Sequence, residues 1–278
     1  MITEVAHLVP WLDVQTIVPL AGATCETYAV NDSWIVQIGR TNYAANTLRH
    51  QARVLPKLAT HLGAKVPGAQ LVCDGPTTIV YKRIDGVRCD EATNGAWSAQ
   101  LGGLLSRLHA IPPNTLGLET VGADTLRADH RDDCRRLLAA VAPRLDQADR
   151  IAADRLVSNY LDDEANWRFA PTVIHGDLVP ANVLVSSSGE LVGVIDWEEV
   201  RTGDPASDFA WWLHADPAIG ERMVSAYGGA PEPRFAARAR HAYALAPWHD
   251  VAHGIALRDE PAVAAALDGV RARLAQAV

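Results

Sequence analysis

The sequence predicts an α+β fold in two lobes, an N-terminal antiparallel sheet with one helix and a mainly helical C-terminal lobe that contains a β-hairpin. Short β-branched runs separated by turn residues dominate the chain up to about residue 85. Beyond that point apolar residues recur at helical spacing, except between residues 173 and 196, where strand-like runs return. We therefore expect an N-terminal lobe at residues 1–85 and a C-terminal lobe at residues 86–278.

The N-terminal lobe is expected to consist of strands around one helix. The sequence Asn-Asp-Ser joins the first two β-branched runs, and Asp-Gly-Pro joins the last two; both are typical of tight turns. The long segment between them has an apolar stripe at helical spacing. The segment Ile-Asp-Gly at residues 84–86 ends this part. The expected strands are residues 15–30, 33–39, 67–73 and 77–84, and the expected helix is residues 41–62.

The C-terminal lobe is expected to be mainly helical. Residues 98–111 carry four leucines at i, i+3, i+4 and i+7 before Pro-Pro-Asn ends the pattern. Residues 125–161 indicate one or two charged amphipathic helices, and the chain is helical again from about residue 217. Only the segment after residue 173 interrupts these helices with strands.

Composition excludes several classes of protein. A net charge of −8 and an isoelectric point near 5.6 argue against a general nucleic-acid binder, which needs a basic face. The four cysteines show no C-x-x-C spacing, so neither a disulfide framework nor a cysteine zinc site is expected. The first residues lack the basic region of a signal peptide, and no apolar run reaches membrane-spanning length. We expect a cytoplasmic protein.

The candidate chemistry lies between residues 173 and 212. A short apolar run leads into His175, Gly176 and Asp177, and Asn182 then begins a strand whose hairpin partner ends at Asp196. Because the start of one antiparallel strand lies beside the end of the other, the side chains of Asn182 and Asp196 should meet at the open end of the hairpin. Their hard oxygen atoms suit Mg²⁺, and Asp177 should lie beside that ion.

A carboxylate next to such an ion is what phosphoryl transfer to an alcohol requires. The order H-G-D-x-x-x-x-N, I-D-W and G-D-P-x-x-D-x-A resembles the aminoglycoside-phosphotransferase-like branch of the protein-kinase-like fold. The resemblance extends over nearly the whole chain and is specific at residues 173–212. It implies transfer of the γ-phosphoryl group of ATP, with GTP possible, to a hydroxyl of a small molecule. R-T-G-D-P-A-S-D follows Asp196 closely and leaves no activation segment, so a protein substrate is not expected.

Matched position by position, the resemblance implies a role for each residue of this stretch. Asp177 would be the catalytic base, and His175, counted with it among the catalytic residues, would support the catalytic loop together with Asp208. Asn182 and Asp196 would bind Mg²⁺. Gly176 would permit the tight backbone. Two further aspartates, Asp204 and Asp208, would be structural, with helix capping as the simpler reading. The hinge near residues 80–83 would meet the adenine, which makes Tyr81 and Arg83 candidate nucleotide contacts.

The sequence departs from the pattern where kinases of this fold place a strand lysine and a helix glutamate. Gln37 and Gln51 occupy those positions. We expect the two amides to hydrogen-bond each other while Arg40 or Mg²⁺ supplies positive charge; the alternative is a nucleotide site that has decayed. The glycine loop offers only Gly22, so contacts from Gly22, Thr24 and Thr27 to phosphate compete with plain turn roles.

The resemblance implies an antibiotic as acceptor, and the wording D-W-E-E-V-R-T-G-D-P is closest to viomycin-type kinases. Acids near the cleft would suit a cationic acceptor, although solvated surface acids are the default interpretation. The tryptophans could be pocket wall or core. A metabolic kinase for choline, a sugar or an amino acid is the runner-up. The candidate substrate contacts are Glu198, Glu199, Trp211, Trp212, Trp248, His249 and Asp250.

Two other classes of protein compete with the kinase. The segment H-D-V-A-H from His249 to His253 is similar to a zinc-peptidase helix, with Asp250 in place of the usual glutamate and no third ligand evident. A binding protein that sequesters a ligand without reacting is the other class, and the two glutamines motivate it. Zinc content would favour the first, and the absence of ADP production would favour the second.

Overall fold

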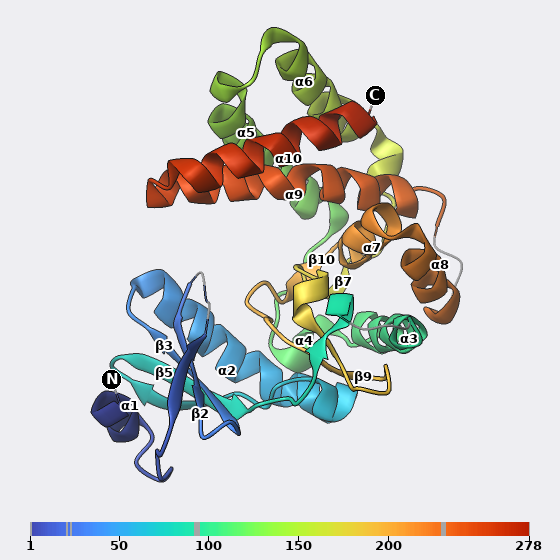
Figure 1. Ribbon diagram of the computed structural model, residues 1–278. Coiled ribbons are helices and arrows are strands. Elements are labelled where there is room, and N and C mark those ends of the chain that lie inside the picture. Colours follow the sequence, from blue (N-terminus) through green and yellow to red (C-terminus); the bar gives the residue numbers. More distant parts are fainter. Residues whose placement is uncertain (1, 21, 23, 92–94, 229–231, 278) are drawn as a thin grey trace.

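The N-terminal lobe of the computed structural model is a five-stranded antiparallel sheet in the order β1-β2-β3-β5-β4 (Figure 1). The structure describes residues 2–20, 22, 24–91, 95–228 and 232–277. Asn31 and Asp32 both adopt positive φ in the turn between β2 and β3, as a tight hairpin requires. The strands are β1 (Ile17–Leu20), β2 (Glu26–Val30), β3 (Trp34–Gly39), β4 (Gln70–Asp74) and β5 (Thr77–Lys82).

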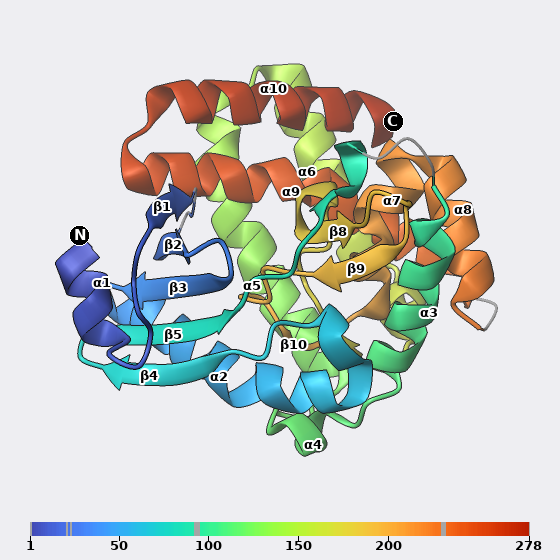
Figure 2. The same ribbon diagram turned by 60° about the horizontal axis from the view of Figure 1, so that its bottom comes forward.

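Helix α2 (Asn42–Leu62) packs on this sheet against β3 and β5 (Figure 2). The hydroxyl of Thr41 caps it by accepting a hydrogen bond from the Ala44 N–H. Its stripe of Leu48, Leu55 and Leu58 is fully buried. The helix joins the lobes as well, because it also contacts the C-terminal helices α3 (Trp97–His109) and α4 (Pro113–Leu116).

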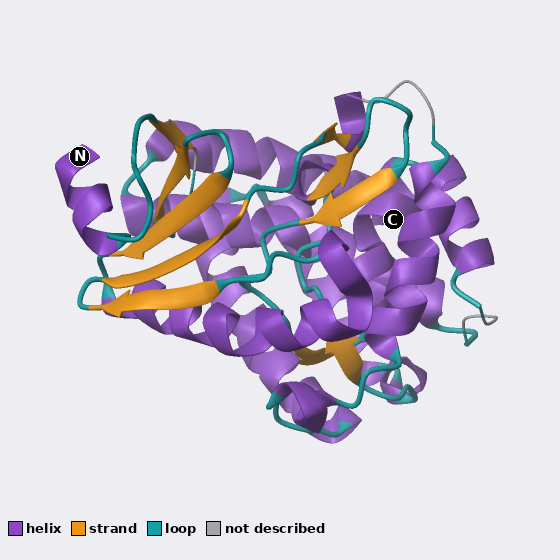
Figure 3. Cartoon of the chain, turned by 90° about the horizontal axis from the view of Figure 1, so that it is seen from below, coloured by secondary structure: helices purple, strands orange, loops and turns teal. Residues whose placement is uncertain are grey.

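Helices dominate the C-terminal lobe, and Figure 3 shows the large sheet at one end of the molecule with most helices at the other. Pairs of helices pack along their lengths, most extensively α9 with α10 and α3 with α8. The remaining helices are α5 (Ala123–Val141), α6 (Gln147–Asp162), α7 (Ala210–Ala215), α8 (Pro217–Ala226), α9 (Phe235–Leu257) and α10 (Glu260–Ala277).

Short strands set into this lobe carry the segment of interest. The hairpin of β8 (Val183–Val185) and β9 (Leu191–Val194) pairs Val183 with Val194, and β6 (Val87–Arg88) adds to its edge. Strand β7 (Thr172–Ile174) pairs with β10 (Arg201–Gly203). The two small sheets therefore bracket the loop that contains Asp177.

The lobes share one hydrophobic core, which runs from Leu48 and Leu55 of α2 through Leu101 and Leu105 of α3 to the hairpin. A second core joins α5, α6, α9 and α10. A third lies between the sheet and α1 (Ile2–Leu8). The junction after residue 85 stays a prediction, since residues 83–86 link β5 of the large sheet to β6 of the hairpin sheet.

The α+β fold and its order of elements are confirmed, with local differences. Residues 15–30 form two strands with a turn between them, because the Gly22 loop reverses the chain. Residues 125–161 split into α5 and α6. The sequence did not predict α1, which is too short to show a clear helical period. Among the described residues, no helix combines the length and apolarity needed to cross a membrane.

Candidate active site

One buried carboxylate fixes the loop after β7. The backbone N–H groups of His175 and Gly176 each donate to Asp208, both at 2.9 Å. Burial works to raise the pKa of this fully buried carboxyl, but the hydrogen bond from His109 and the nearby backbone N–H of Gly176 outweigh it and hold the pKa below its usual value. Asp208 therefore anchors the loop and is not a helix cap.

Gly176 has a backbone that other residues rarely adopt, with φ of 88°. A Cβ added there would lie 2.6 Å from the carbonyl oxygen of Glu199. Both the dihedral and the space therefore require glycine. This tight turn brings the loop against the chain that follows the hairpin.

His175 ties the same loop to the end of the hairpin. Its buried ring accepts a hydrogen bond at Nδ1 from the Asp177 N–H, at 3.2 Å, and its Nε2 lies 3.0 Å from the carbonyl oxygen of Ile195. These partners select the neutral tautomer with the proton on Nε2. Burial lowers the pKa of the ring in agreement with that state. His175 therefore lies where it can support the loop and the end of the hairpin, the supporting role that the resemblance implies.

His109, at the end of α3, is a supporting residue that the sequence did not reveal. Its Nε2 lies 3.1 Å from Asp208 and its Nδ1 2.7 Å from the hydroxyl of Tyr227. The available signal was its position one residue beyond Leu108, on the buried side of an apolar helix. A polar residue buried in such a place needs partners, and here the partner holds the catalytic loop.

The structure brings Asp177 and Asn182 into direct contact. The Asn182 amide donates to the main-chain carbonyl of Asp177 at 2.9 Å and to its carboxylate at 3.2 Å. The N–H of Ile195 donates to the Asn182 carbonyl at 2.9 Å, which extends the hairpin ladder by one pair. Asp196 comes next, with φ of 63°. Asn182 and the residue before Asp196 are therefore paired where the hairpin opens, as the strand pairing predicted, and the charge of Asp177 acts on Asp196 there.

Negative charge accumulates at this point. Burial raises the pKa of Asp196 to about 6, and the charges of Glu198, Asp177 and Glu199 add to the shift. Among the described residues, no lysine or arginine forms an ion pair with Asp196. Oxygen donors crowded together without a counter-charge are the donor set that Mg²⁺ takes, so the residues fit this ion.

Glu198 links this acidic group to the N-terminal lobe. Burial raises its pKa, and a hydrogen bond with the hydroxyl of Thr24 partly opposes that effect. Thr24 belongs to the loop between β1 and β2, which contains Gly22 and whose residues 21 and 23 lie outside the described part of the chain. A Cβ on Gly22 would lie 2.7 Å from the Cys25 carbonyl oxygen, so the loop is tightly folded. The loop thus contacts Glu198 of the C-terminal lobe.

The predicted hydrogen bond between Gln37 and Gln51 is wrong. Gln37 instead donates to the hydroxyl of Thr27 at 3.5 Å. The Gln37 Oε1 and Gln51 Nε2 atoms are buried, and within the described ranges neither has a hydrogen-bond partner. The glutamine pair therefore leaves one acceptor and one donor unused, which is unfavourable unless a ligand satisfies them.

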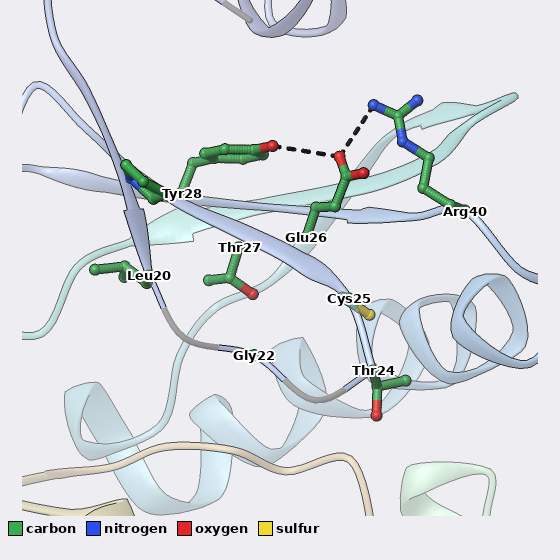
Figure 4. A pocket seen from close by; sticks show the side chains of 9 residues that line it. Leu20, Gly22, Thr24, Cys25, Glu26, Thr27, Tyr28 and Arg40 are labelled. Atoms are coloured by element: carbon green, nitrogen blue, oxygen red, sulfur yellow. Dashed lines mark hydrogen bonds and ion pairs between the residues drawn. The ribbon is translucent and has the colours of Figure 1, made fainter. Parts of the chain in front are cut away.

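Arg40 does not offer the free positive charge that the sequence suggested. It pairs with Glu4 at 2.5 Å and with Glu26 at 3.0 Å. Figure 4 shows Glu26 between the Arg40 guanidinium and the Tyr28 hydroxyl, on the wall of a pocket of about 420 Å³ that Gly22 and Thr24 also line. Two carboxylates already neutralise the arginine.

The two candidate hinge residues, Tyr81 and Arg83, lie in different surroundings. Burial raises the pKa of Tyr81, and the charges of Asp196 and Glu198 contribute, which places its hydroxyl within electrostatic reach of the acids. Arg83 instead lies at the β2–β3 turn, where its N–H donates to the Ser33 carbonyl and its guanidinium is 3.8 Å from Asp32. Tyr81 is the better candidate for a nucleotide contact.

Two tryptophans proposed as substrate contacts belong to the core. Trp212 is 2% exposed and packs edge-on against Trp97, and Trp248 is fully buried between the C-terminal helices. The helical spacing of apolar residues cannot distinguish a core residue from one that lines a pocket. The burial of these two side chains shows that they are core residues. Trp211 is partly buried beside Tyr243.

His249 and Asp250, which follow Trp248 on α9, lie within electrostatic reach of Glu199 and Asp177. His249 lies 3.6 Å from Asp133, and the charge of Glu199 acts on its pKa, which burial lowers. Burial raises the pKa of Asp250, and the charge of Asp177 adds to that shift. His249, Asp250 and His253 do not gather as metal ligands among the described residues. The zinc-peptidase alternative therefore has no support.

Asp204 is structural, as expected. Its carboxylate caps the turn after it by accepting from the Ala206 N–H at 2.9 Å, and it pairs with the buried Arg238 at 2.6 Å. Arg238 also pairs with Glu232. The pair fixes α9 to the segment that supplies Asp208.

Solved structures share this fold. The chain superimposes on the GDP and kanamycin complex of APH(2")-IIia with a TM-score of 0.85 and 19% identity, over 99% of this chain and 98% of that chain. It superimposes on macrolide 2'-phosphotransferase MphH from Brachybacterium faecium with a TM-score of 0.73 and 21% identity, over 97% of each chain. These likenesses establish the protein-kinase-like fold.

The sequence comparisons agree with the geometry. Viomycin phosphotransferase of Streptomyces vinaceus is 30% identical over 194 residues, which cover 63% of this chain and 65% of that protein. The chain spans less than two thirds of the length of the curated relatives it matches. The model of the phosphotransferase enzyme family matches residues 16–246, a range that contains the whole loop and hairpin described above. The chain therefore belongs to the phosphotransferase enzyme family.

Proposed function

We propose that the chain transfers the γ-phosphoryl group of ATP, or of GTP, to a hydroxyl of a small-molecule antibiotic and so inactivates it. The observation that carries the proposal is the amide of Asn182, which holds the Asp177 carboxylate at the open end of the hairpin beside Asp196. Membership of the family supplies the reaction class.

Asp177 would act as the general base. Its carboxylate takes the proton of the acceptor hydroxyl as that oxygen forms a bond to the γ-phosphorus. The bond from the γ-phosphorus to the bridging oxygen breaks, and the bridging oxygen leaves with the electron pair as part of the nucleoside diphosphate. Asn182 and the backbone hydrogen bonds to Asp208 keep Asp177 oriented throughout.

Asn182 and Asp196 are the residues that would hold Mg²⁺, with Glu198 nearby. When bound, Mg²⁺ neutralises the charge that develops on the phosphates. On the protein's side, the cation would relieve the repulsion among carboxylates that adds to the effect of burial on the pKa of Asp196.

The nucleotide would bind between the glycine loop and the hinge. Structural neighbours are complexes with GDP and with ADP, which supports a nucleotide here. The unpartnered Gln37 Oε1 and Gln51 Nε2 offer an acceptor and a donor in the place of the usual ion pair. Such a nucleotide-dependent reaction would run in the cytoplasm, where nucleoside triphosphates are supplied.

The acceptor is proposed to be cationic. The charges of Asp177, Glu198 and Glu199 act on Asp196, and the charge of Asp177 also acts on Asp250. The field around these acids therefore favours positively charged molecules. The relative that is similar over most of the chain is named for viomycin, which supports a peptide antibiotic. A macrolide, as in the MphH name, or a nucleoside antibiotic remains in the test set.

The test is an ADP- and GDP-release screen of the full chain with Mg²⁺. The acceptors would be viomycin and a second cationic peptide antibiotic, kanamycin, a macrolide, a nucleoside antibiotic, choline, a hexose and an amino acid. Turnover with a cationic antibiotic supports the proposal. Turnover only with choline, a hexose or an amino acid makes the chain a metabolic kinase, and nucleotide binding without turnover on any acceptor makes it a binding protein.

A further inference from the structure

Two histidines and one cysteine meet between α5 and α9, outside the acidic group around Asp196. His130 and Cys134 stand one turn apart on α5, and His241 faces them from α9. The His130 Nε2 lies 2.9 Å from the His241 Nε2 and 3.4 Å from the Cys134 Sγ, and the three atoms lie within 4.8 Å of one another. Across the described ranges, no other three His, Cys, Asp or Glu side chains gather in this way. Figure 1 shows α5, α6, α9 and α10 as one group of helices.

Hydrogen bonding alone leaves this cluster poorly satisfied. Nε2 of a neutral imidazole carries either one proton or one lone pair, yet the Nε2 of His130 has two partners. Cys134 is fully buried and His241 is 4% exposed, so water does not replace a missing bond. A single cation would engage the lone pairs of all three atoms together.

The two separations that involve His130 are close to those of a tetrahedral zinc site, and the third lies within 4.8 Å. Zn–N bonds near 2.05 Å and Zn–S bonds near 2.3 Å put ligand atoms about 3.3 Å apart for N–N and about 3.6 Å apart for N–S. The observed 2.9 and 3.4 Å differ from these values by a few tenths of an ångström. Side-chain rotation within one rotamer can supply that change.

We propose that His130, Cys134 and His241 form a structural Zn²⁺ site that joins α5 to α9. Imidazole nitrogen and thiolate sulfur bind zinc in preference to magnesium, which takes oxygen ligands. The site is therefore chemically distinct from the oxygen atoms around Asp196. Binding releases the proton of the Cys134 thiol to solvent as the Zn–S bond forms.

Aromatic side chains enclose most of the cluster, and with three protein ligands the fourth position of a tetrahedral zinc would be taken by a water molecule. The ring of Tyr160 from α6 stacks on the ring of His241, with the ring centroids 3.6 Å apart and the ring planes 3° from parallel. Trp167 packs beside His130. Outside this shell, Asp133 and His249 are the titratable groups that act on His130. Within the described residues the Nδ1 of His241 has no hydrogen-bond partner. The site thus lacks the outer acceptor that strengthens many zinc sites, and its affinity should lie below that of a four-ligand site.

The test is cobalt substitution in the full chain after removal of metal with a chelator. One equivalent of Co²⁺ should produce the visible bands of tetrahedral cobalt together with a near-ultraviolet thiolate charge-transfer band. Cys134→Ser should lose the charge-transfer band. Cys89→Ser is the matched control, because Cys89 is equally buried but its thiol only donates to the Pro180 carbonyl. Asp196→Asn should keep the band, which separates this site from the magnesium site.

Unfolding provides a second readout. At free Zn²⁺ about 100 times Kd, the unfolding midpoint of the wild type should rise by roughly 5 °C, with no rise in Cys134→Ser. If Cys134→Ser does not fold, His130→Gln should weaken Co²⁺ binding at least about 10-fold. A wild type without a charge-transfer band, or a band that persists in Cys134→Ser, overturns the proposal.

Discussion

The Asn182 side chain holds Asp177 at two points, donating one hydrogen bond to its main-chain carbonyl and one to its carboxylate. An amide that contacts both atoms fixes the rotation of the aspartate as well as its position. Since the carbonyl of Asn182 also accepts from the N–H of Ile195, the same residue connects Asp177 to the strand that ends at Asp196. The proposed proton acceptor and the proposed metal ligands are thereby positioned by one short segment of backbone.

Gly176→Ala should damage both stability and activity. Its φ of 88° and the 2.6 Å approach of a Cβ to the Glu199 carbonyl oxygen make alanine strained, at a cost of roughly 1–3 kcal/mol or more. Gly103→Ala is the matched control, because a Cβ there meets nothing within 4 Å and a mid-helix alanine is favourable. Urea unfolding with kcat measurement checks both, and equal effects in the two variants would contradict this reading.

Asp208→Asn should destabilise the chain by roughly 3 kcal/mol near neutral pH, since it breaks a buried network of charged hydrogen bonds. Because the folded state holds the Asp208 pKa below its usual value, the unfolded chain binds the proton more readily. The stabilisation is therefore complete above about pH 4 to 5 and is lost as the pH falls through the folded-state pKa.

The measurement is the difference in free energy of unfolding between wild type and Asp208→Asn, followed from pH 7 downward. The difference should stay constant to about pH 5 and then shrink. A difference that grows on acidification would mean that Asp208 is protonated in the folded protein.

The sequence was sufficient for the residues that lie within one local motif. The relative placement of Asp177, Asn182 and Asp196 could be predicted because their spacing and the hairpin between them fix it, while their roles stay a prediction. The residues that support this motif could not be predicted, because they come from distant parts of the sequence. His109 and Asp208, for example, are in contact although 99 residues separate them. Only their burial in the structure distinguished Trp212 and Trp248 from pocket residues. The side chains of Gln37 and Gln51 could in principle hydrogen-bond each other, and sequence spacing could not show that they do not.

Gln51→Leu should weaken nucleotide binding at least about tenfold while raising stability by about 1 kcal/mol. Its buried amide nitrogen lacks a partner in the described structure, so removing it costs the folded chain nothing and deprives the nucleotide of a donor. Arg40→Ala should leave affinity within about twofold, because Glu4 and Glu26 already neutralise that arginine. Calorimetric titration with ADP checks both variants; unchanged affinity in Gln51→Leu would return the glutamines to a purely structural role.

Asp250→Asn should raise KM for a cationic acceptor about 3- to 10-fold and leave kcat and the nucleotide KM nearly unchanged. Asp250 lies on α9, and the charge of Asp177 in the loop after β7 acts on it. The effect should shrink at high ionic strength. Asp216→Asn is the control, because it also removes a carboxylate charge while the asparagine Oδ1 can still cap α8. A fall in kcat with constant KM would show that Asp250 acts on the reaction and not on acceptor binding.

The most direct measurement is single-turnover phosphoryl transfer by Asp177→Asn with an acceptor identified in the screen, alongside nucleotide affinity. The asparagine keeps the shape and the contact to Asn182 but cannot take the hydroxyl proton, so the rate should fall by about 10²- to 10⁴-fold while ADP affinity stays within a few-fold. A rate close to that of the wild type would show that Asp177 is not the proton acceptor.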